Sequence, residues 1–581
     1  MAIIPMQKVA IMSLKSLKED VLHLLHDEGV LEVCDAREGV GGIDHTEVKF
    51  RKAELEFAIS ALLPLASKKL RAAMDKKPTK EEVVIAALHT DIRSIIDQVH
   101  ALDKKEHEAR KHLHEHKKGM DEGSVGSGVN EAAYFTGSVP HANVKTAAAT
   151  PAAMPDAEER AEMHRLEKNL EDVHDARLRL AEELPNLARA LIYLRWLDDK
   201  QAVREAMRET KGTVTLFGWV TKKNIAHLEK KLHDLSDATA LMKVKPDENE
   251  SVPVQLKNNP LLTPFESVTK LYGLPQSNEM DPTPYLSIFF ILFFGLCLTD
   301  AGYGLTLALI MGGYLLKARK YPSQAPLFWL LFLSGIVTFF VSIPFGGWFG
   351  VSPDDVPAYL TKPDPDGDGR LFLGQIWNLS DQTGITFLQN LALALGIIHL
   401  TFGIMLGAYS KVRSGQLAAG LWMDGTSLLF IGFTLTYFFG PSEYQQIFLY
   451  CIFGSLALMV WGKGHGNTLV KRPLFGFLQT LNFFLGMMGN VLSYLRILAL
   501  GLVTGALAFT VNLVAEQISA FLPWFLAIPL AIVIYIVGHI ANIVLNVLGA
   551  FIHSGRLQFV EFFSQFFEGG GRPFRPFTRE V

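Results

Sequence analysis

The strongest constraint on this fold is a series of apolar segments between residues 284 and 556. A helix that crosses a bilayer needs about 20 apolar residues, and these segments reach or approach that length. About eight can be counted, at 284–299, 301–316, 326–345, 385–408, 426–440, 444–461, 477–515 and 523–556. A helix of about 33 residues is about 50 Å long, against a hydrocarbon core of about 30 Å. The last two segments are therefore expected to tilt strongly or to protrude.

The first 280 residues have a different character, with many charged side chains between the apolar ones. The mean hydropathy of +0.21 is thus an average over two halves in two solvents. We predict a cytoplasmic domain at 1–280 and an all-α transmembrane domain at 281–581. The start of the chain lacks the features of a cleaved signal peptide, so the polar half is expected to stay in the cytoplasm. A net charge of −4 indicates no nucleic-acid partner.

The three cysteines, Cys34, Cys297 and Cys451, are far apart and form no metal-binding or disulfide pattern. This suits a reducing compartment, and we expect no metal and no cofactor.

The polar half begins with a pattern typical of a small α/β unit. Residues 6–12 predict a buried strand, 13–29 a helix that ends at Gly29, and 30–35 a second strand, which is a βαβ-like start. A strand, a turn and a helix are repeated near 212–235. We therefore predict globular regions at 1–80 and 212–245, one at each end of a helical rod. Residues 133–140 add a possible strand and turn.

The rod itself is predicted from heptad spacing of apolar residues. Steps of 4, 3, 4 and 3 join Leu88, Ile92, Ile95, Val99 and Leu102. A second seam contains Met163, Leu166, Leu170, Val173, Arg177 and Leu180. The two seams favour an antiparallel coiled-coil hairpin of helices at 81–118 and 156–200. An ordinary helical bundle is the alternative.

The loops between the apolar segments predict the orientation. With a cytoplasmic N-terminus, the inner loops carry Lys317, Arg319, Lys320, Lys411, Arg413, Lys463, Lys471 and Arg472. The outer loops carry only Lys362 and Arg370 among many acidic residues. This bias is typical of a multi-pass membrane protein with both termini in the cytoplasm. A prokaryotic plasma membrane is the expected location.

Arg496 is the sharpest functional signal, because it lies well inside the segment 477–515. An arginine at mid-bilayer costs at least about 2.5–3.5 kcal/mol, and it keeps its proton. Such a residue normally faces water, a carboxylate or another helix; the alternative is a structural or snorkelling arginine. Small and polar residues recur on the same helix face, namely Asn482, Gly486, Gly489, Ser493 and Thr504.

The last segment carries a second polar stripe at steps of 3 and 4. It consists of His539, Asn542, Asn546, Gly549, His553 and Arg556. A lone histidine in a span is more often a packing residue, but a whole stripe that ends in an arginine favours function. Polar groups at membrane depth are tolerated where they line protein-enclosed water. Two such helices could line two aqueous half-channels that meet near a charge.

Several motifs in these segments resemble one family. The run "NVLSYLRILALGLVTGALA" is similar to the arginine-bearing helix of subunit a, called subunit I in prokaryotes, of the V-type and A-type rotary ATPases. "FIHSGRLQFVEFFSQFFEGGGRPFRPF" resembles the C-terminal signature of that family. "VPVQLKNNPLLTPFESVTKLYGLPQSNEMDPTPY" and "FFGLCLTDAGYGL" resemble its entry into the membrane. The resemblance covers 250–581.

The resemblance implies a non-catalytic stator subunit that couples H⁺ or Na⁺ translocation to ATP hydrolysis or synthesis. Arg496 would face a carboxylate on each passing subunit of a proteolipid ring, and Arg556 would support it. The implied half-channel lining is Asn482, Ser493, Thr504, His539, Asn542, Asn546, His553 and Glu561. The implied partners are the ring, the peripheral stalks, the central-stalk sector and the lipid bilayer.

Three positions depart from the eukaryotic relatives, which have acidic residues in place of Asn482 and Asn546 and a histidine in place of Thr504. The ion path and the choice between H⁺ and Na⁺ are therefore open. No nucleotide-binding loop occurs, so the chain is not expected to hydrolyse ATP itself.

A secondary transporter with a regulatory domain would show an internal repeat of spans, and none is visible. A structural anchor or receptor would leave Arg496 unexplained. The sequence "DPDGDG" at 364–369 fits the start of an EF-hand, but Gln375 stands where a glutamate is required, which favours an acidic turn.

Overall fold

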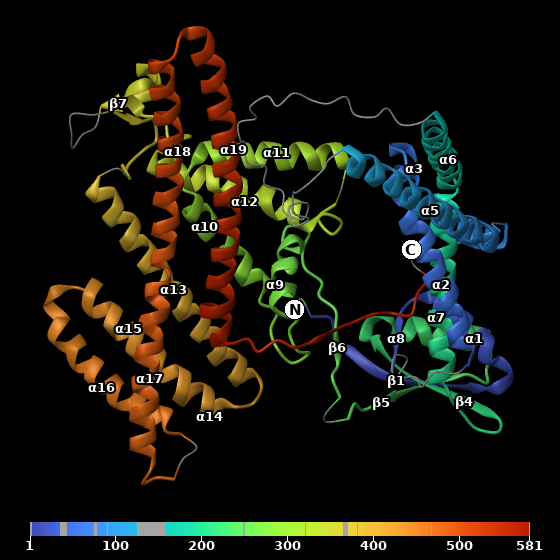
Figure 1. The fold of residues 1–581 in the computed structure, drawn as a ribbon. Helices are drawn as coiled ribbons and strands as arrows, with labels where there is room; N and C mark the ends of the chain where they lie inside the picture. The colour runs from blue at the N-terminus through green and yellow to red at the C-terminus, as the bar shows by residue number, and fades with distance from the viewer. Residues whose placement is uncertain are drawn as a thin grey trace. The chain divides into compact units, whose positions relative to one another are not determined.

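The computed structural model describes residues 3–34, 43–74, 78–89, 91–124, 157–247, 250–319, 321–363, 370–379, 381–465 and 468–579. The chain forms two compact units (Figure 1). The head unit comprises Gln7–Lys245 and Arg575–Val581, and the apolar unit comprises Met1–Met6 and Pro246–Phe574. The predicted division at 280/281 therefore lies inside the apolar unit, because residues 246–280 pack with the apolar helices.

One sheet organises the head unit, in the order β2-β4-β1-β5, with β3 paired to β4. Its strands are β1 Met6–Leu14, β2 Leu31–Val33, β3 Arg208–Glu209, β4 Thr213–Thr221 and β5 Ala240–Val244. β2 is antiparallel to β4, with Leu31 opposite Val220, and β1 is antiparallel to β5. The prediction of two separate globules at 1–80 and 212–245 is therefore wrong. Their strands alternate in one sheet, and β4 separates the two strands of the βαβ-like start.

The first helix next to this sheet ends where the sequence predicts but begins later, at Lys18 instead of residue 13. α1 (Lys18–Glu28) ends where Gly29 takes a left-handed conformation with φ 61°, which glycine adopts without steric cost. α8 (Ile225–Leu235) follows β4. Val9, Ile11, Leu22 and Leu228 are buried in the core between these helices and the sheet.

The remaining head helices form a second core. They are α2 Ile43–Leu62, α3 Lys68–Met74, α4 Lys80–His89, α5 Ile92–Ser124, α6 Ala157–Ala181 and α7 Leu184–Ala206. The single helix predicted from residue 81 is two helices, and Leu88 at the end of α4 is 71% exposed rather than part of a seam. Ile95 and Val99 are buried, together with Leu55 of α2 and Leu184 of α7. These two residues thus belong to a bundle of several helices.

α5 and α6 also contact each other directly. The guanidinium of Arg177 on α6 binds Asp103 at 2.8 Å and Glu106 at 2.5 Å, both on α5. Val173, one turn earlier on α6, is buried. A coiled-coil hairpin along the whole length of the two helices stays a prediction. The strand expected at 133–140 lies outside the described residues.

Seven segments of the apolar unit are, among the described residues, long and apolar enough to cross a membrane. They are Ala301–Ala318, Pro326–Phe345, Gln382–Arg413, Leu417–Phe439, Ser442–Lys463, Arg472–Phe521 and Trp524–Gln565. An eighth apolar helix, Thr283–Leu298, is shorter. Each of the eight predicted segments therefore has a helical counterpart, although 477–515 is divided between two helices.

The apolar unit also contains short strands and helices. Its elements are β6 Pro253–Val254, α9 Glu266–Tyr272, α10 Thr283–Leu298, α11 Ala301–Ala318, α12 Pro326–Ser342, β7 Thr361–Pro363, β8 Arg370–Phe372, α13 Gln382–Arg413, α14 Leu417–Ala419, α15 Thr426–Phe439, α16 Gln445–Lys463, α17 Arg472–Ser493, α18 Leu495–Phe521, α19 Trp524–Arg556 and β9 Arg572–Pro573. A π-helical turn, Leu557–Phe562, extends α19. The long helices α18 and α19 pack against each other, as Figure 1 shows in orange and red.

α10 lies in the centre of the apolar unit, where Phe290, Phe293 and Phe294 are fully buried. α11 and α12 approach each other closely because glycines face the neighbouring helix. A Cβ atom on Gly304 would lie 2.7 Å from the backbone nitrogen of Phe339, and one on Gly335 would lie 2.8 Å from that of Ala308. The close contact fixes the position of the α10–α11 turn.

Three chain segments of the apolar unit lie side by side near the points where the chain passes to the head unit. Ile3 bridges to Leu256, and the backbone nitrogen of Ile4 donates to Gln255. β6 and β9 pair in parallel, with Val254 opposite Pro573. The first residues, the segment after the head and the segment before the C-terminus are thus hydrogen-bonded to one another.

Candidate functional site

A break between α17 and α18 places Arg496. The ring of Tyr494, at the break, is fully buried against Gly396 of α13, where a Cβ atom would lie 2.7 Å from it. Arg496 is the second residue of α18 and is half-buried. Its Nη1 atom is buried and has no hydrogen-bond partner within the described part of the chain. A guanidinium donor is therefore held inside an apolar segment without a bond.

Several predicted site residues gather around this arginine, and we call Ser493, Arg496, His553, Arg556 and Glu561 the arginine cluster. Glu561 lies on the π-helical turn and is buried. Its carboxylate interacts with the Ser493 side chain and, electrostatically, with Arg496 and Arg556. Both arginines also act on His553. The turn after α19 thus returns a carboxylate to the two cations.

Next to the cluster lies a buried pair that sequence reasoning missed. Nδ1 of His399 on α13 is 2.8 Å from the hydroxyl of Tyr494, and both side chains are fully buried. The imidazole lies between the rings of Phe289 and Phe562, at centroid distances of 4.2 and 4.1 Å. The only sequence signal for this pair was the single histidine, His399, within the apolar segment 385–408. It has no polar companions at helical spacing.

A second set of polar residues joins α11, α18 and α19, and we call Tyr303, Asn512, His539, Asn542 and Asn546 the tyrosine network. The Tyr303 hydroxyl is 2.7 Å from Nδ1 of His539 and 2.8 Å from Nδ2 of Asn542. Nε2 of His539 is 3.0 Å from Oδ1 of Asn512. Nδ2 of Asn546 donates to Oδ1 of Asn542 at 2.5 Å. The predicted stripe on α19 is therefore divided between this network and the arginine cluster.

Two predicted residues join neither set through their side chains. Asn482 is exposed on α17. The buried hydroxyl of Thr504 donates to the carbonyl of Leu500 on its own helix, although its carbonyl oxygen accepts from Asn542 at 3.4 Å. Tyr303 and Asn512 were missed. Asn512 continues the stripe two turns beyond Thr504, so a longer periodicity search would have included it, whereas Tyr303 had no such signal.

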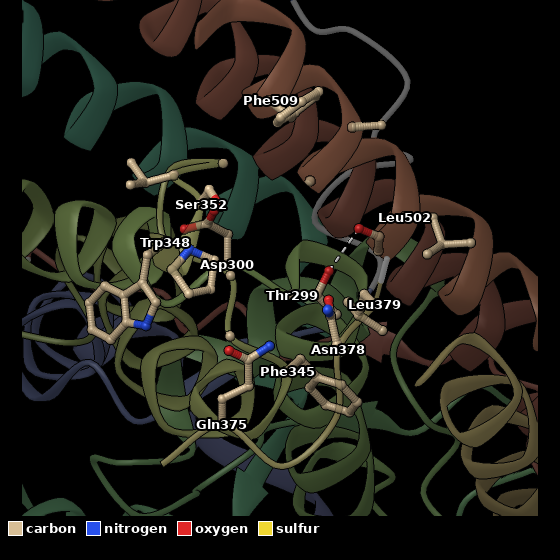
Figure 2. A pocket seen from close by; sticks show the side chains of 18 of the residues that line it. Thr299, Asp300, Phe345, Trp348, Ser352, Gln375, Asn378, Leu379, Leu502 and Phe509 are labelled. Atoms are coloured by element: carbon tan, nitrogen blue, oxygen red, sulfur yellow. Dashed lines mark hydrogen bonds between the residues drawn. The ribbon is translucent and has the colours of Figure 1, made fainter. Parts of the chain in front are cut away.

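A cavity of about 500 Å³ lies beside Asp300, the residue that precedes α11 (Figure 2). Thr299, Asp300, Gln375 and Asn378 line it, and Gly505 of α18 faces it. Asp300 caps the start of α11: its carboxylate accepts from the backbone nitrogens of Tyr303 and Phe349, each at 2.9 Å. Thr299 donates to the carbonyl of Gly501, the dashed bond in Figure 2. The cavity is therefore polar on one wall.

Metal binding finds no support in the part of the chain that the structure describes, which contains no group of three or more His, Cys, Asp or Glu side chains able to hold an ion. The whole sequence "DPDGDG" at 364–369 lies outside the described residues. Gln375, at its twelfth position, is buried and accepts from the backbone nitrogen of Phe372.

The head unit contains a separate polar site, formed by the C-terminal segment. The ring of Phe577 stacks on His26, with centroids 4.3 Å apart. Arg579 donates to Nδ1 of His26 at 3.1 Å and pairs with Asp27 at 3.0 Å. Burial, and next the charge of Arg579, lower the pKa of His26 to about 4. His26 is therefore held neutral at ordinary pH.

Comparison with known proteins shows which family the chain resembles. A model of the V-type ATPase 116 kDa subunit family matches residues 204–334 and 474–579, which include the tyrosine network and the arginine cluster. The A-type ATP synthase subunit I of Methanocaldococcus jannaschii is 33% identical over 449 residues, 71% of this chain and 63% of that protein. That of Pyrococcus abyssi is 32% identical over 437 residues, covering 71% and 62%.

A bacterial relative, the V-type ATP synthase subunit I of Chlamydia muridarum, is 26% identical over 426 residues, 63% of this chain and 62% of that protein. The matched part of the chain spans slightly less than two thirds of the length of these relatives. The matched residues, the apolar helices and the resemblance of the arginine-bearing helix agree, and the chain is similar to the V-type ATPase 116 kDa subunit family over these residues.

Proposed function

We propose that this chain is the non-catalytic stator subunit of a rotary V/A-type ATPase. Its apolar unit would cross the cell membrane several times, with both termini in the cytoplasm, and form ion half-channels beside a proteolipid ring. Its head unit would bind the peripheral stalks. The observation that carries the proposal is Arg496, a permanent cation with a buried, unbonded donor inside an apolar segment of 50 residues.

The chemistry required of Arg496 is electrostatic. A guanidinium that meets a ring carboxylate at short range favours the ionised form of that carboxylate. Each ring site must therefore release its ion before it passes the arginine, and the fixed positive charge opposes a direct leak of cations. The guanidinium as a whole is half-buried, so its accessible atoms, and not the buried Nη1, can bind a group from outside the chain.

Glu561 and Arg556 would keep Arg496 in place. A buried charge is destabilised unless an opposite charge or hydrogen bonds compensate it. Glu561 supplies an opposite charge near both arginines, and the π-helical turn holds it there. Arg556 is exposed, so water can take over part of its role.

The half-channel lining would then fall into two groups. Asn482, Ser493, His553 and Glu561 lie on the side of Arg496 toward the predicted cytoplasmic loops. Thr504, His539, Asn542 and Asn546 would lie on the other side. Arg496 and Thr504 are eight residues apart on α18, about 12 Å along the helix. The second group contains no carboxylate. Its hydroxyl and amide groups can bind either water that carries H⁺ or Na⁺.

Copurification is the direct test. The tagged chain, extracted in mild detergent, should come out with a small, very apolar ring subunit and with stalk subunits, all identified by mass spectrometry. A secondary transporter would come out alone or as a homo-oligomer and would transport without ATP hydrolysis. Recovery without any ring subunit, from cells that express one, would refute the stator role.

Ion identity requires a second measurement on the same complex. Activity that needs Na⁺ at constant pH would assign Na⁺, whereas uptake that acidifies vesicles in the absence of Na⁺ would assign H⁺. Both ions are compatible with the neutral lining, so only this comparison separates them.

A further inference from the structure

In the tyrosine network the direction of each hydrogen bond follows from the one before it. The starting point is Asn512. Its Nδ2 atom donates to the carbonyl of Phe349 at 2.8 Å, so its Oδ1 atom faces His539. An amide oxygen can only accept a hydrogen bond. Nε2 of His539 must therefore carry a proton.

The next bonds follow in the same way. The Tyr303 oxygen accepts from Nδ2 of Asn542, and its own proton then needs an acceptor. The acceptor in reach is Nδ1 of His539, at 2.7 Å. A second proton on His539 would turn Nδ1 into a donor and leave the Tyr303 hydroxyl proton without an acceptor among the described residues. The arrangement that satisfies all these groups contains a neutral imidazole.

We propose that Tyr303 is a positioning residue that holds His539 as the neutral Nε2–H tautomer and orients the amide groups of Asn542 and Asn546. This inference deepens the proposed function, on which its transport part rests. The part of the α19 stripe that belongs to the tyrosine network, His539, Asn542 and Asn546, would then serve as an uncharged lining of the outer half-channel, in which His539 takes no part in proton transfer.

The surroundings of His539 support a neutral state. Tyr535, one turn earlier on α19, lies nearly parallel to the imidazole at a centroid distance of 6.1 Å. The ring of Phe349 is 6.0 Å away on another side. The carboxylate of Asp300, next to the network, accepts from the backbone nitrogens of Tyr303 and Phe349. Glu516, one turn after Asn512, is exposed.

A neutral lining matters because of Arg496. A histidine cation on α19 would add a third fixed positive charge to the pair of helices that carries Arg496 and Arg556, and it would repel the ion that has to pass. Tyr303, at the start of α11 and far from Arg496 in sequence, would thus affect the charge of the ion path.

The tautomer can be measured on the purified, full-length complex by ¹⁵N NMR with labelled histidine. The chain has 18 histidines, so the signal of His539 is assigned by difference from His539→Gln. We expect an unprotonated Nδ1 and a protonated Nε2 throughout the pH range in which the complex is active. A protonated Nδ1 in the unmodified protein would overturn the proposal without any further variant.

Tyr303→Phe tests the cause. Loss of one hydrogen bond should shift the tautomer ratio of His539 by about fivefold toward Nδ1–H. Tyr535→Phe is the matched control, because it removes a hydroxyl from the neighbouring tyrosine with no hydrogen bond to His539, and it should leave the signal unchanged. An unchanged His539 signal in Tyr303→Phe would show that the tyrosine does not set the tautomer.

Transport tests the consequence. In Tyr303→Phe, ATP-driven ion uptake should fall more steeply toward acid pH than in the unmodified protein, and adding His539→Gln should remove the extra pH dependence. An altered NMR signal with an unaltered pH profile would overturn the half-channel part. If the unmodified complex transports no ion, the stator role is contradicted, and the NMR result still decides the tautomer.

Discussion

Arg496 combines two properties that rarely occur together, a charge that cannot be removed and a place in an apolar helix. The structure adds that one of its donors is buried and unbonded. Lysine would keep the charge but would lose the planar arrangement of donors and could release its proton when buried. The role proposed for this residue therefore depends on its chemistry as well as on its charge.

We predict that Arg496→Ala and Arg496→Gln abolish ATP-driven ion uptake while the complex still assembles. Arg496→Lys should be severely impaired, because a proton-releasing cation cannot hold the ring carboxylate ionised. The assay is uptake into vesicles, normalised to assembled complex. Uptake by Arg496→Ala at close to the unmodified rate would make the arginine structural.

Arg556→Ala should reduce uptake less than Arg496→Ala does. Arg556 is exposed at the end of α19, where solvent can screen the loss of its charge near Glu561. The same vesicle assay gives the ratio of the two effects. An equal loss in both variants would mean that the two arginines act as one unit.

The residues found from sequence and those that were missed differ in a physical way. Arg496 and the α19 stripe stand out because polarity inside an apolar run is costly wherever it occurs. Tyr303 and His399 act through partners 236 and 95 positions away. No local pattern encodes such pairs, since tertiary packing alone brings them together.

At the scale of elements, apolar spacing located the helices but not their partners. The seam residues Ile95 and Val99 are buried as expected, but α2 and α7 surround them. Leu88 fits the same spacing and is exposed, because α4 ends one residue after it. Heptad spacing describes one face of a helix and does not say how many helices cover that face.

The double variant Ile95→Asp/Val99→Asp should disrupt the helical core of the head unit. Each change loses about 1.5–3 kcal/mol of apolar burial and also buries a carboxylate. Stalk subunits should be lost from the purified complex, while the apolar unit still inserts into the membrane. Leu88→Asp is the matched control and should be silent. Normal stalk content in the double variant would contradict the attachment role of this core.

Single cysteines can test the predicted orientation of the apolar helices. In a protein whose three native cysteines are replaced, Asp355→Cys should react with an impermeant reagent from outside the cell, and Ser414→Cys should not. Both positions are exposed, so accessibility to solvent does not separate them. The opposite labelling pattern would reverse the orientation drawn from the basic loops.

At the scale of the whole molecule, hydropathy separated the chain into two parts but could not predict the return of the C-terminus to the head. Phe577 and Arg579 close a site on α1 that lies more than 550 positions earlier in the chain. The division at 245/246 was missed for the same reason, since residues 246–280 are not apolar enough to be assigned to the membrane part. Chain ends that pair over such distances leave no periodic signal.

Acid should loosen this C-terminal contact. The pKa of His26 is about 4 in the folded protein against an ordinary 6.5, so the folded head binds fewer protons than the unfolded one. The stabilisation is complete above about pH 6.5 and is lost as the pH falls toward 4. The difference corresponds to about 3 kcal/mol.

Hydrogen exchange of the peptide that contains Phe577 and Arg579 measures this effect, because both backbone nitrogens donate to the head unit. Exchange, corrected for its intrinsic pH dependence, should quicken between pH 6.5 and 4. His26→Phe keeps a ring beside Phe577 and should remove the pH dependence. The same acid response in that variant would exclude His26 as the cause.

The three hydrogen-bonded segments at Ile3, Val254 and Phe574 have a mechanical consequence. The backbone passes between the two units three times. A twist applied to the head is therefore carried by three segments of the chain at once instead of by one linker. A single proteolytic nick in any one of them would leave the units tethered by the other two. A fragment that stops at residue 245 would keep the sheet but would lack Phe577 and Arg579, which cover His26. Its response to tension would therefore differ from that of the head unit in the full chain.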